Sequence, residues 1–274
     1  MRNWVLITGC STGIGQALVP LCRGAGWGVV ATARNLASLA DLPPGEDLRI
    51  LALDVTNTAS IAAAAAGCAG LRLKALVNNA GYGQVGPLEC LRPEELRAQF
   101  ETNVIGLQSM TNIFLPLLRR EPGARILQVA SMLGRLSIPL AGPYNASKHA
   151  VVALTETLRL EVGREVAVVL VEPGAIKTAF RDTLAKVWGD LPERVRGTRY
   201  EAIIVGYLAQ RKGQAERFAM GAEACASRML TALNANHPPR RVVIGWDAFW
   251  VGKLKAILPA AWWERLLRMA YGLG

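Results

Sequence analysis

The sequence has little of what metal centres and disulfide frameworks require. Its 274 residues include only two histidines, His149 and His237, which lie too far apart to predict a shared metal site. The five cysteines are odd in number and scattered, and no two of them form a C-x-x-C pair. This distribution indicates a reducing compartment and argues against a disulfide scaffold or a zinc site, so we expect no metal.

Long uncharged hydrophobic runs are also missing. No apolar run reaches the ~18 residues that a membrane-spanning helix needs, so we expect no such helix. Residues 4–8 already have the composition of a strand, so we expect no signal peptide ahead of the fold. These features predict a cytoplasmic protein.

Acidic residues are in deficit, with 21 against 31 basic residues and a formal net charge of +10. Such a balance attracts nucleic acids, anionic membrane surfaces or phosphorylated ligands. The lysines and arginines are dispersed, and no basic–aromatic interleaving occurs before the C-terminal region. We therefore expect no nucleic-acid partner.

The chain does contain an alternation of strand-like and helix-like segments, which is typical of a parallel sheet. With 51% hydrophobic residues, it can bury such a sheet on both faces. We predict an α/β fold in a single domain over 1–274, with a doubly wound, seven-stranded parallel sheet and helices on both faces. Predicted strands cover 4–8, 28–32, 49–53, 73–77, 125–130, 166–171 and 241–245. Predicted helices cover 13–24, 35–40, 57–67, 93–119, 145–162 and stretches within 180–235.

A tyrosine and a lysine stand four residues apart in Tyr144-Asn145-Ala146-Ser147-Lys148. On a helix this spacing puts both side chains on one face. A fixed cation about 4 Å from a phenol is worth about 4 kcal/mol at an effective dielectric near 20. That equals roughly three pKa units, enough to bring a tyrosine from about 10 toward 7. The spacing alone is also common on ordinary surface helices.

A glycine-rich segment follows the first strand, in Thr8-Gly9-Cys10-Ser11-Thr12-Gly13-Ile14-Gly15. The residues after it have helical apolar spacing. A strand, a glycine-rich turn and a helix start form a dinucleotide-binding arrangement, in which the helix N-terminus faces the pyrophosphate. A glycine-rich loop without that context would be an ordinary turn.

Together these residues resemble the short-chain dehydrogenase/reductase family, which implies a Rossmann-type fold. Five elements of the family occur in its order between residue 4 and about 180: Thr8-Gly9-x-x-x-Gly13-x-Gly15, Asn78-Asn79-Ala80-Gly81, Asn103, the set Ser131, Tyr144 and Lys148, and Pro173-Gly174-x-x-x-Thr178.

The resemblance implies a nicotinamide dinucleotide as cofactor. The residues expected to bind it are Gly9, Ser11, Thr12, Gly13, Ile14, Gly15, Arg34, Asp54, Val55, Asn79, Ala80, Gly81, Tyr144, Lys148, Pro173, Gly174, Ile176 and Thr178. Asp54 matches the family's adenine contact, although a turn or helix-capping aspartate is an equal alternative.

The end of the second predicted strand distinguishes the two nicotinamide cofactors. An acid there binds the ribose hydroxyls of NAD, whereas arginine pairs with the 2′-phosphate of NADP. The family's acid would fall at Ala33, and Arg34 follows it. We therefore predict NADP(H), with the Thr12 hydroxyl as a further contact; the alternative is that Arg34 is a solvated loop residue.

The resemblance also implies roles in a hydride-transfer reaction. Tyr144 is expected to be the general acid and base, Lys148 to lower its pKa and hold the nicotinamide ribose, and Ser131 to bind the substrate oxygen. Asn103 is expected to hold a water that links Lys148 to solvent, or to be a structural asparagine. No metal takes part.

The substrate end is predicted to be lipophilic. Residues 132–140 are mainly apolar, with Arg135 expected at the rim. A substrate lid is expected over about 180–225, and its apolar residues are Phe180, Leu184, Val187, Trp188, Leu191, Tyr200, Ile203, Ile204, Tyr207 and Leu208. The order of motifs and this extension are similar to the steroid and retinoid branch of the family. By this analogy the substrate is a bulky secondary alcohol or ketone.

An amphipathic extension is expected over about 246–274, where tryptophans recur at helical spacing among lysines and arginines. We favour a tail helix packed over the substrate site or at a dimer contact. The alternative is a peripheral contact with a membrane surface.

Three functions remain open at this level. The first is an NADP(H)-dependent alcohol dehydrogenase or carbonyl reductase, working as a homo-oligomer (a dimer or tetramer). The others are a carrier-bound 3-oxoacyl reductase and a non-catalytic NADP(H)-sensing regulator. The intact tyrosine–lysine pair disfavours the regulator.

Overall fold

A computed structural model describes residues 2–178, 187–211 and 219–273. Seven parallel strands form the central sheet in the order β3-β2-β1-β4-β5-β6-β9. They are β1 (Trp4–Ile7), β2 (Gly28–Ala33), β3 (Leu48–Ala52), β4 (Leu73–Asn78), β5 (Arg125–Val129), β6 (Ala167–Pro173) and β9 (Arg241–Ile244). This confirms the predicted doubly wound sheet, whose strand order reverses between β1 and β4. A ligand site is expected beyond the strand ends at that point.

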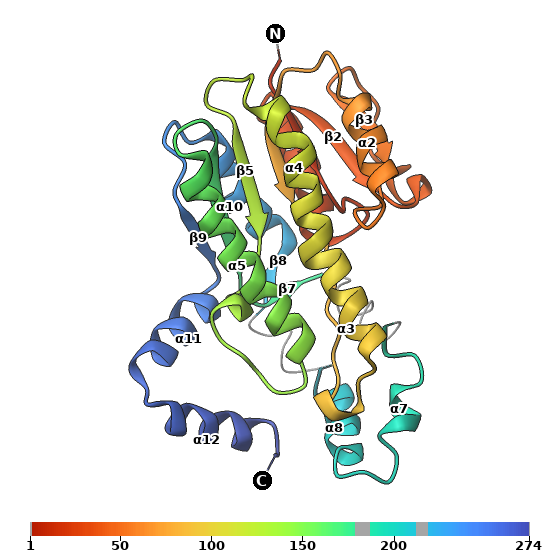
Figure 1. The fold of residues 1–274 in the computed structure, drawn as a ribbon, viewed down its shortest axis with the longest axis vertical. Coiled ribbons are helices and arrows are strands. Elements are labelled where there is room, and N and C mark those ends of the chain that lie inside the picture. Colours follow the sequence, from red (N-terminus) through yellow and green to blue (C-terminus); the bar gives the residue numbers. More distant parts are fainter. Residues whose placement is uncertain (1, 179–186, 212–218, 274) are drawn as a thin grey trace.

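Both faces of the sheet are buried under helices. Val5 and Ile7 of β1 point to one face, where α1 (Gly13–Gly24) and α10 (Ala222–Asn234) pack. Leu6 points to the other, which α2 (Thr58–Gly67), α4 (Leu107–Leu118) and α5 (Gly142–Val162) cover. Figure 1 shows α4 and α5 in front of the sheet and α10 behind it. Burial on both faces explains why β1 reads as a continuous apolar run.

Two predicted helices differ from the structure. The stretch predicted as one helix over 93–119 contains α3 (Pro93–Phe100), a π-helical turn (Glu101–Gly106) and α4. Single π-helical turns inside helices frequently mark functional sites. The segment predicted as a helix over 35–40 forms only a short 3₁₀ helix, Leu36–Leu39.

The helix that carries the tyrosine and lysine begins earlier than predicted, at Gly142 rather than residue 145. Pro143 suits the first turn because its missing N–H would have no helical partner there. Tyr144 therefore lies in the first turn of α5, and Lys148 lies one turn further on.

The predicted lid region contains α7 (Leu191–Arg194) and α8 (Glu201–Arg211), and a two-stranded sheet of β7 (Ile176–Lys177) and β8 (Met220–Gly221) lies beside it. Trp188 and Leu191 are buried in a small apolar cluster with Leu140. Phe180, Leu184 and the side chains of Tyr207 and Leu208 lie outside the described residues.

The C-terminal arm, residues 246–273, contains α11 (Trp246–Ile257) and α12 (Ala260–Ala270). In Figure 1 both helices project from the body of the molecule beside the lower end of α5. Trp263 is buried and Tyr271 packs against the cluster of Trp188, which fits the favoured expectation of a packed tail. Most other large apolar side chains of the arm are exposed, which does not fit it. In the described ranges no helix combines the length and apolarity needed to cross a bilayer.

Candidate active site

One large cavity is lined by nearly all of the site residues that the sequence predicts. It has a volume of about 1300 Å³ and opens at the carboxyl ends of the strands. The nominated residues that line it are Gly9, Ser11, Thr12, Gly13, Ile14, Arg34, Asp54, Val55, Asn79, Ala80, Gly81, Ser131, Tyr144, Lys148, Pro173, Gly174, Ile176 and Thr178. Gly15 and Asn103 do not line it and lie behind its wall.

The glycine loop between β1 and α1 needs its glycines for two reasons. Gly9 and Gly13 have φ values of 72° and 65°, in the left-handed region that side chains disfavour. A Cβ at Gly15 would overlap the carbonyl oxygen of Gly9. The loop therefore packs closely on the start of α1, whose N-terminal amides carry partial positive charge.

Asn79 holds the loop after β4 against the glycine loop. Its Nδ2 donates to the carbonyl oxygens of Thr8 (2.9 Å) and Gly9 (3.2 Å). The Thr8 hydroxyl in turn accepts from the backbone N–H groups of Asn79 and Ala80, both at 2.9 Å. These bonds fix two walls of the cavity relative to each other.

Ser131, Tyr144 and Lys148 meet at the deep end of the cavity. Ser131 follows β5; its Oγ accepts from Leu133 N at 3.2 Å, and its side chain is hydrogen-bonded to Tyr144. The Lys148 ammonium lies 5.7 Å from the centre of the Tyr144 ring and donates to the Val129 carbonyl oxygen at 2.8 Å. The helix spacing predicted for the tyrosine and lysine thus gives a side-by-side pair.

Asn103, in the π-helical turn, is buried and bound on both sides of its amide. Its Oδ1 accepts from Tyr82 N at 3.1 Å, and its Nδ2 donates to Tyr82 O at 2.9 Å and to Ser147 Oγ at 3.1 Å. Ser147 lies between the tyrosine and lysine on α5 and donates to the carbonyl oxygen of Tyr144 at 2.8 Å. Asn103 therefore joins the loop after β4 to α5, and its expected part in a water relay stays a prediction.

The chain matches the short chain dehydrogenase family over residues 3–187. It is 38% identical over 251 residues to estradiol 17-beta-dehydrogenase 1 of Rattus norvegicus, covering 86% of this chain and 72% of that protein. This chain belongs to the short-chain dehydrogenase family. It is therefore an oxidoreductase with a nucleotide-binding Rossmann fold.

Solved structures of this family resemble the whole chain. A short-chain dehydrogenase from Burkholderia cenocepacia in complex with NADP has a TM-score of 0.75 at 27% identity, covering 97% of this chain and 98% of that one. Another from Burkholderia phymatum, in complex with NAD, has a TM-score of 0.78 at 27% identity and covers 93% of both chains. Because similar dehydrogenases bind either cofactor, the choice between NAD and NADP depends on individual side chains.

In this dehydrogenase, the pKa values of Tyr144 and Lys148 shift in the directions that favour the neutral side chains. Burial raises the pKa of Tyr144 to about 12, and the hydrogen bond with Ser131 only partly opposes it. Burial also lowers the pKa of Lys148 to about 8. Burial thus opposes the expected fall of the tyrosine pKa toward 7, and the part of Lys148 in lowering it stays a prediction.

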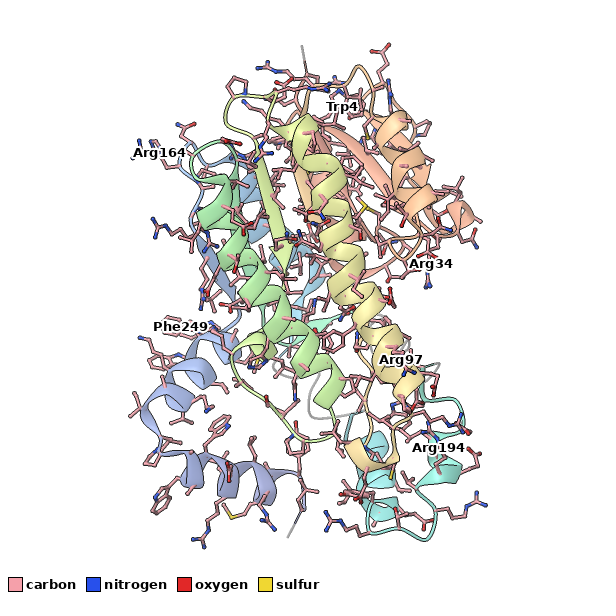
Figure 2. All side chains as sticks on the ribbon, in the orientation of Figure 1. Trp4, Arg34, Arg97, Arg164, Arg194 and Phe249 are labelled. Atoms are coloured by element: carbon pink, nitrogen blue, oxygen red, sulfur yellow. The ribbon has the colours of Figure 1, made fainter. Side chains whose placement is uncertain are left out.

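Arg34 lines the cavity directly after β2. Figure 2 shows it projecting at the edge of the molecule, and Ala33 occupies the place of the acid. Hydrogen bonds from Thr56 lower the pKa of Asp54, and the charge of Arg34 lowers it further. Asp54 Oδ1 accepts from Thr56 N (2.9 Å) and Thr56 Oγ1 (2.7 Å). This oxygen therefore stabilises a turn, which is the alternative role given above for Asp54.

Asp247 is a cavity residue that the sequence analysis missed. Its carboxylate, in the first turn of α11, accepts from Ala175 N at 2.6 Å. Ala175 follows Pro173 and Gly174, the segment that the family resemblance places at the nicotinamide. The sequence signal was only an aspartate after Gly245, and helix-terminal aspartates are too common to be diagnostic. Its position becomes visible only when the end of the chain folds back to β6.

The substrate end of the cavity is partly as predicted. Met132, Leu133, Ile138 and Val187 line it as apolar side chains. Arg135, expected at the rim, does not line the cavity; its Nε lies 3.0 Å from the buried carboxylate of Glu172, and its side chain stays partly exposed. Further lining residues were not anticipated; they include the polar Tyr82 and Gln84, the acids Glu94, Glu95 and Glu101, and the C-terminal Tyr271.

Proposed function

We propose that this dehydrogenase transfers a hydride between NADP(H) and a bulky lipophilic secondary alcohol or ketone of steroid-, retinoid- or aryl-ketone-like shape. The observation that carries this proposal is the single cavity that joins the Ser131–Tyr144–Lys148 group to Arg34 at one end and to an apolar wall at the other. Its volume of about 1300 Å³ exceeds the ~300–1,000 Å³ that single small ligands fill, so it has room for cofactor and substrate together.

The residues present fit a bound nicotinamide dinucleotide. The glycine loop offers a close backbone approach at the start of α1, where a pyrophosphate is favoured. Asn79, Ala80 and Gly81 would lie along the cofactor from the ribose next to the adenine to the nicotinamide. Tyr144 and Lys148 would contact the nicotinamide ribose. When bound, the cofactor supplies or accepts the hydride.

The side chains supply the proton and the alignment. In the reduction direction, Tyr144 donates its phenol proton to the carbonyl oxygen of the substrate, and Ser131 hydrogen-bonds the same oxygen. Lys148 then stabilises the phenolate that is left behind, so its charge contributes most after the proton has moved. In oxidation Tyr144 acts as the base, and the same lysine favours its deprotonated form.

Arg34 supports NADP(H) over NAD(H). Its guanidinium can form charge-assisted hydrogen bonds with a 2′-phosphate, and no carboxylate stands at Ala33 to repel that phosphate. Thr12 lines the same cavity and offers a hydroxyl. The alternative position of Arg34 as a solvated loop residue predicts no phosphate preference.

The apolar wall formed by Met132, Leu133, Ile138 and Val187 supports a lipophilic substrate. The relative estradiol 17-beta-dehydrogenase 1 is named for a substrate of the same class. We further propose a cytoplasmic homo-oligomer, a dimer or tetramer, that makes peripheral contact with membranes.

A substrate panel followed by NADPH absorbance tests this function. Steroid ketones, retinal and aryl ketones should be reduced with higher kcat/KM than small keto acids. Efficient reduction of a carrier-bound 3-oxoacyl thioester alone would instead support the carrier-bound reductase. NADPH binding without turnover on any ketone or alcohol would support a regulator and contradict the proposal.

A further inference from the structure

The C-terminal arm has an apolar surface that faces solvent. We define the arm surface as the eight large apolar side chains of α11 and α12 that are exposed: Trp246, Phe249, Trp250, Leu254, Ile257, Trp262, Leu266 and Met269. Trp246 and Ile257 reach exposed fractions of 78% and 79%. Their helical spacing places them along one side of each helix, and Trp263, which is buried, lies on a different side of α12. Exposed apolar side chains that follow one side of a projecting helix indicate an interaction site.

Positive charge accompanies this apolar surface. Lys253 lies in the middle of the α11 face, with its ammonium 4.4 Å from the Phe249 ring centre and 5.6 Å from that of Trp250. The arm also contains Lys255, Arg265 and Arg268, against only two acids, Asp247 and Glu264. Asp247 is engaged with the backbone of Ala175. The outward-facing charge of the arm is therefore predominantly positive.

A hollow on α12 brings cations and apolar atoms together. It has a volume of about 730 Å³ and is lined by Ala261, Glu264, Arg265, Arg268, Met269 and Gly272. Two arginines and a methionine, with Glu264 as the one acid among them, suit a ligand with an anionic head and an apolar tail.

The arm is attached to the active site at both ends. At its start, Asp247 is bonded to Ala175, and a Cβ at Gly174 would overlap that carboxylate. At its end, Tyr271 lines the active-site cavity. The orientation of the arm surface is therefore fixed relative to the cavity. Figure 2 shows Phe249 at the outer edge of the molecule, beside α11.

We propose that α11 and α12 dock on an anionic lipid bilayer, with the tryptophans at the headgroup boundary and the lysines and arginines against lipid phosphates. Helices that lie in this boundary place tryptophans and other apolar side chains toward the acyl chains, while nearby lysines and arginines extend their long side chains to the headgroups. A second copy of the chain fits less well, because cores of protein interfaces are depleted in lysine whereas Lys253 stands in the centre of the α11 face. Resting on the proposed function, this docking would place the cavity mouth where lipophilic substrates dissolve.

Vesicle co-sedimentation of the full chain tests the docking directly. The probes are unilamellar vesicles of phosphatidylcholine alone and of phosphatidylcholine mixed with phosphatidylserine. We expect binding to the mixed vesicles, weakened by salt, and about five-fold weaker partitioning for each cation neutralised, as in Lys253→Gln and Arg265→Gln. The triple variant Trp250→Ser, Ile257→Ser, Trp262→Ser should lose binding by more than about ten-fold.

Leu160→Ser is the matched control, because Leu160 is 84% exposed on α5, outside the arm. Leu160→Ser should bind vesicles like the parent. Leu160→Ser and the triple variant should both keep the parent's NADPH affinity, which would show that they are folded. Failure of the parent to bind mixed vesicles, equal binding to both vesicle types, or unchanged binding of the triple variant would each overturn the proposal. If the parent binds no vesicles but is a dimer by light scattering, and only the triple variant is a monomer, the arm surface would be assigned to contact with a second copy of the chain. Because the readout is vesicle binding, failure here leaves the proposed reaction untouched.

Discussion

The carboxylate of Asp247 lies so close to Gly174 that no residue with a side chain could replace the glycine without displacing it. The same carboxylate accepts a hydrogen bond from Ala175 N at 2.6 Å. A residue from the last part of the chain thus holds the backbone segment that follows β6, where we propose that the nicotinamide binds.

Asp247→Ala should therefore weaken NADPH binding. The variant leaves the Ala175 N–H without its acceptor, a loss of at most about 1–3 kcal/mol, so we expect Kd to rise by up to roughly five- to hundred-fold as the segment loses its fixed position. Asp247→Asn keeps an acceptor oxygen and should restore most of the affinity. Glu264→Ala, an acid of the same arm, is the control and should leave the Kd unchanged. Fluorescence titration measures all three, and an unchanged Kd in Asp247→Ala would remove its positioning role.

Arg34→Asp should invert the cofactor preference. It replaces a cation with an anion where the 2′-phosphate is proposed to bind, and charge-assisted hydrogen bonds contribute about 1.5–3 kcal/mol. We expect NADPH affinity to fall by about ten- to hundred-fold and NADH affinity to rise. Arg34→Gln should lose NADPH affinity without gaining NADH affinity. If Arg34→Asp still prefers NADPH, another group recognises the phosphate.

Lys148→Met should make the protein more stable at neutral pH while removing its activity. The folded-state pKa of Lys148 is about 8, below its ordinary 10.5, so the folded state disfavours the ammonium at low pH. Wild-type stability should therefore rise as pH increases from about 8 to 10.5, by up to about 3 kcal/mol at 1.4 kcal/mol per pKa unit. Because the methionine variant lacks this titration, its stability advantage should shrink over the same window. Urea unfolding at pH 7 and pH 10 measures it, and a pH-independent difference would contradict the assigned shift.

Asn103→Ala separates a positioning role from a water relay. The substitution removes three hydrogen bonds that join Tyr82 to Ser147, so we expect a loss of about 2–4 kcal/mol in unfolding free energy together with lower kcat. If the asparagine acts only through a relay, kcat should fall while stability stays unchanged. Chemical denaturation and steady-state kinetics of the same variant distinguish these results.

Much of the fold and site could be predicted because the relevant signals are local. The seven strands were recognisable as apolar runs, and their carboxyl ends bring Gly9, Asn79, Ser131 and Gly174 together regardless of loop details. The start of α5 was misplaced by three residues because Pro143 reads as a helix breaker, although it suits a first turn.

What could not be predicted depends on long-range contacts and burial. Asp247 reaches Ala175 across 72 residues of sequence, and no local pattern encodes that bond. The pKa of Tyr144 depends on how completely the site is buried, which spacing alone does not show. The ion pair of Arg135 could not be predicted either. Its partner Glu172 is buried in an otherwise apolar strand, where a carboxylate is unusual.

The measurement that tests the account most directly is NADPH oxidation with the best ketone of the panel, compared between the wild type and Tyr144→Phe. The phenylalanine keeps the ring against Lys148 but removes the proton donor, so NADPH affinity should change by less than about two-fold while kcat falls by about 10²–10⁴. A Tyr144→Phe protein that retains a substantial fraction of wild-type kcat would contradict the central claim that this tyrosine delivers the proton.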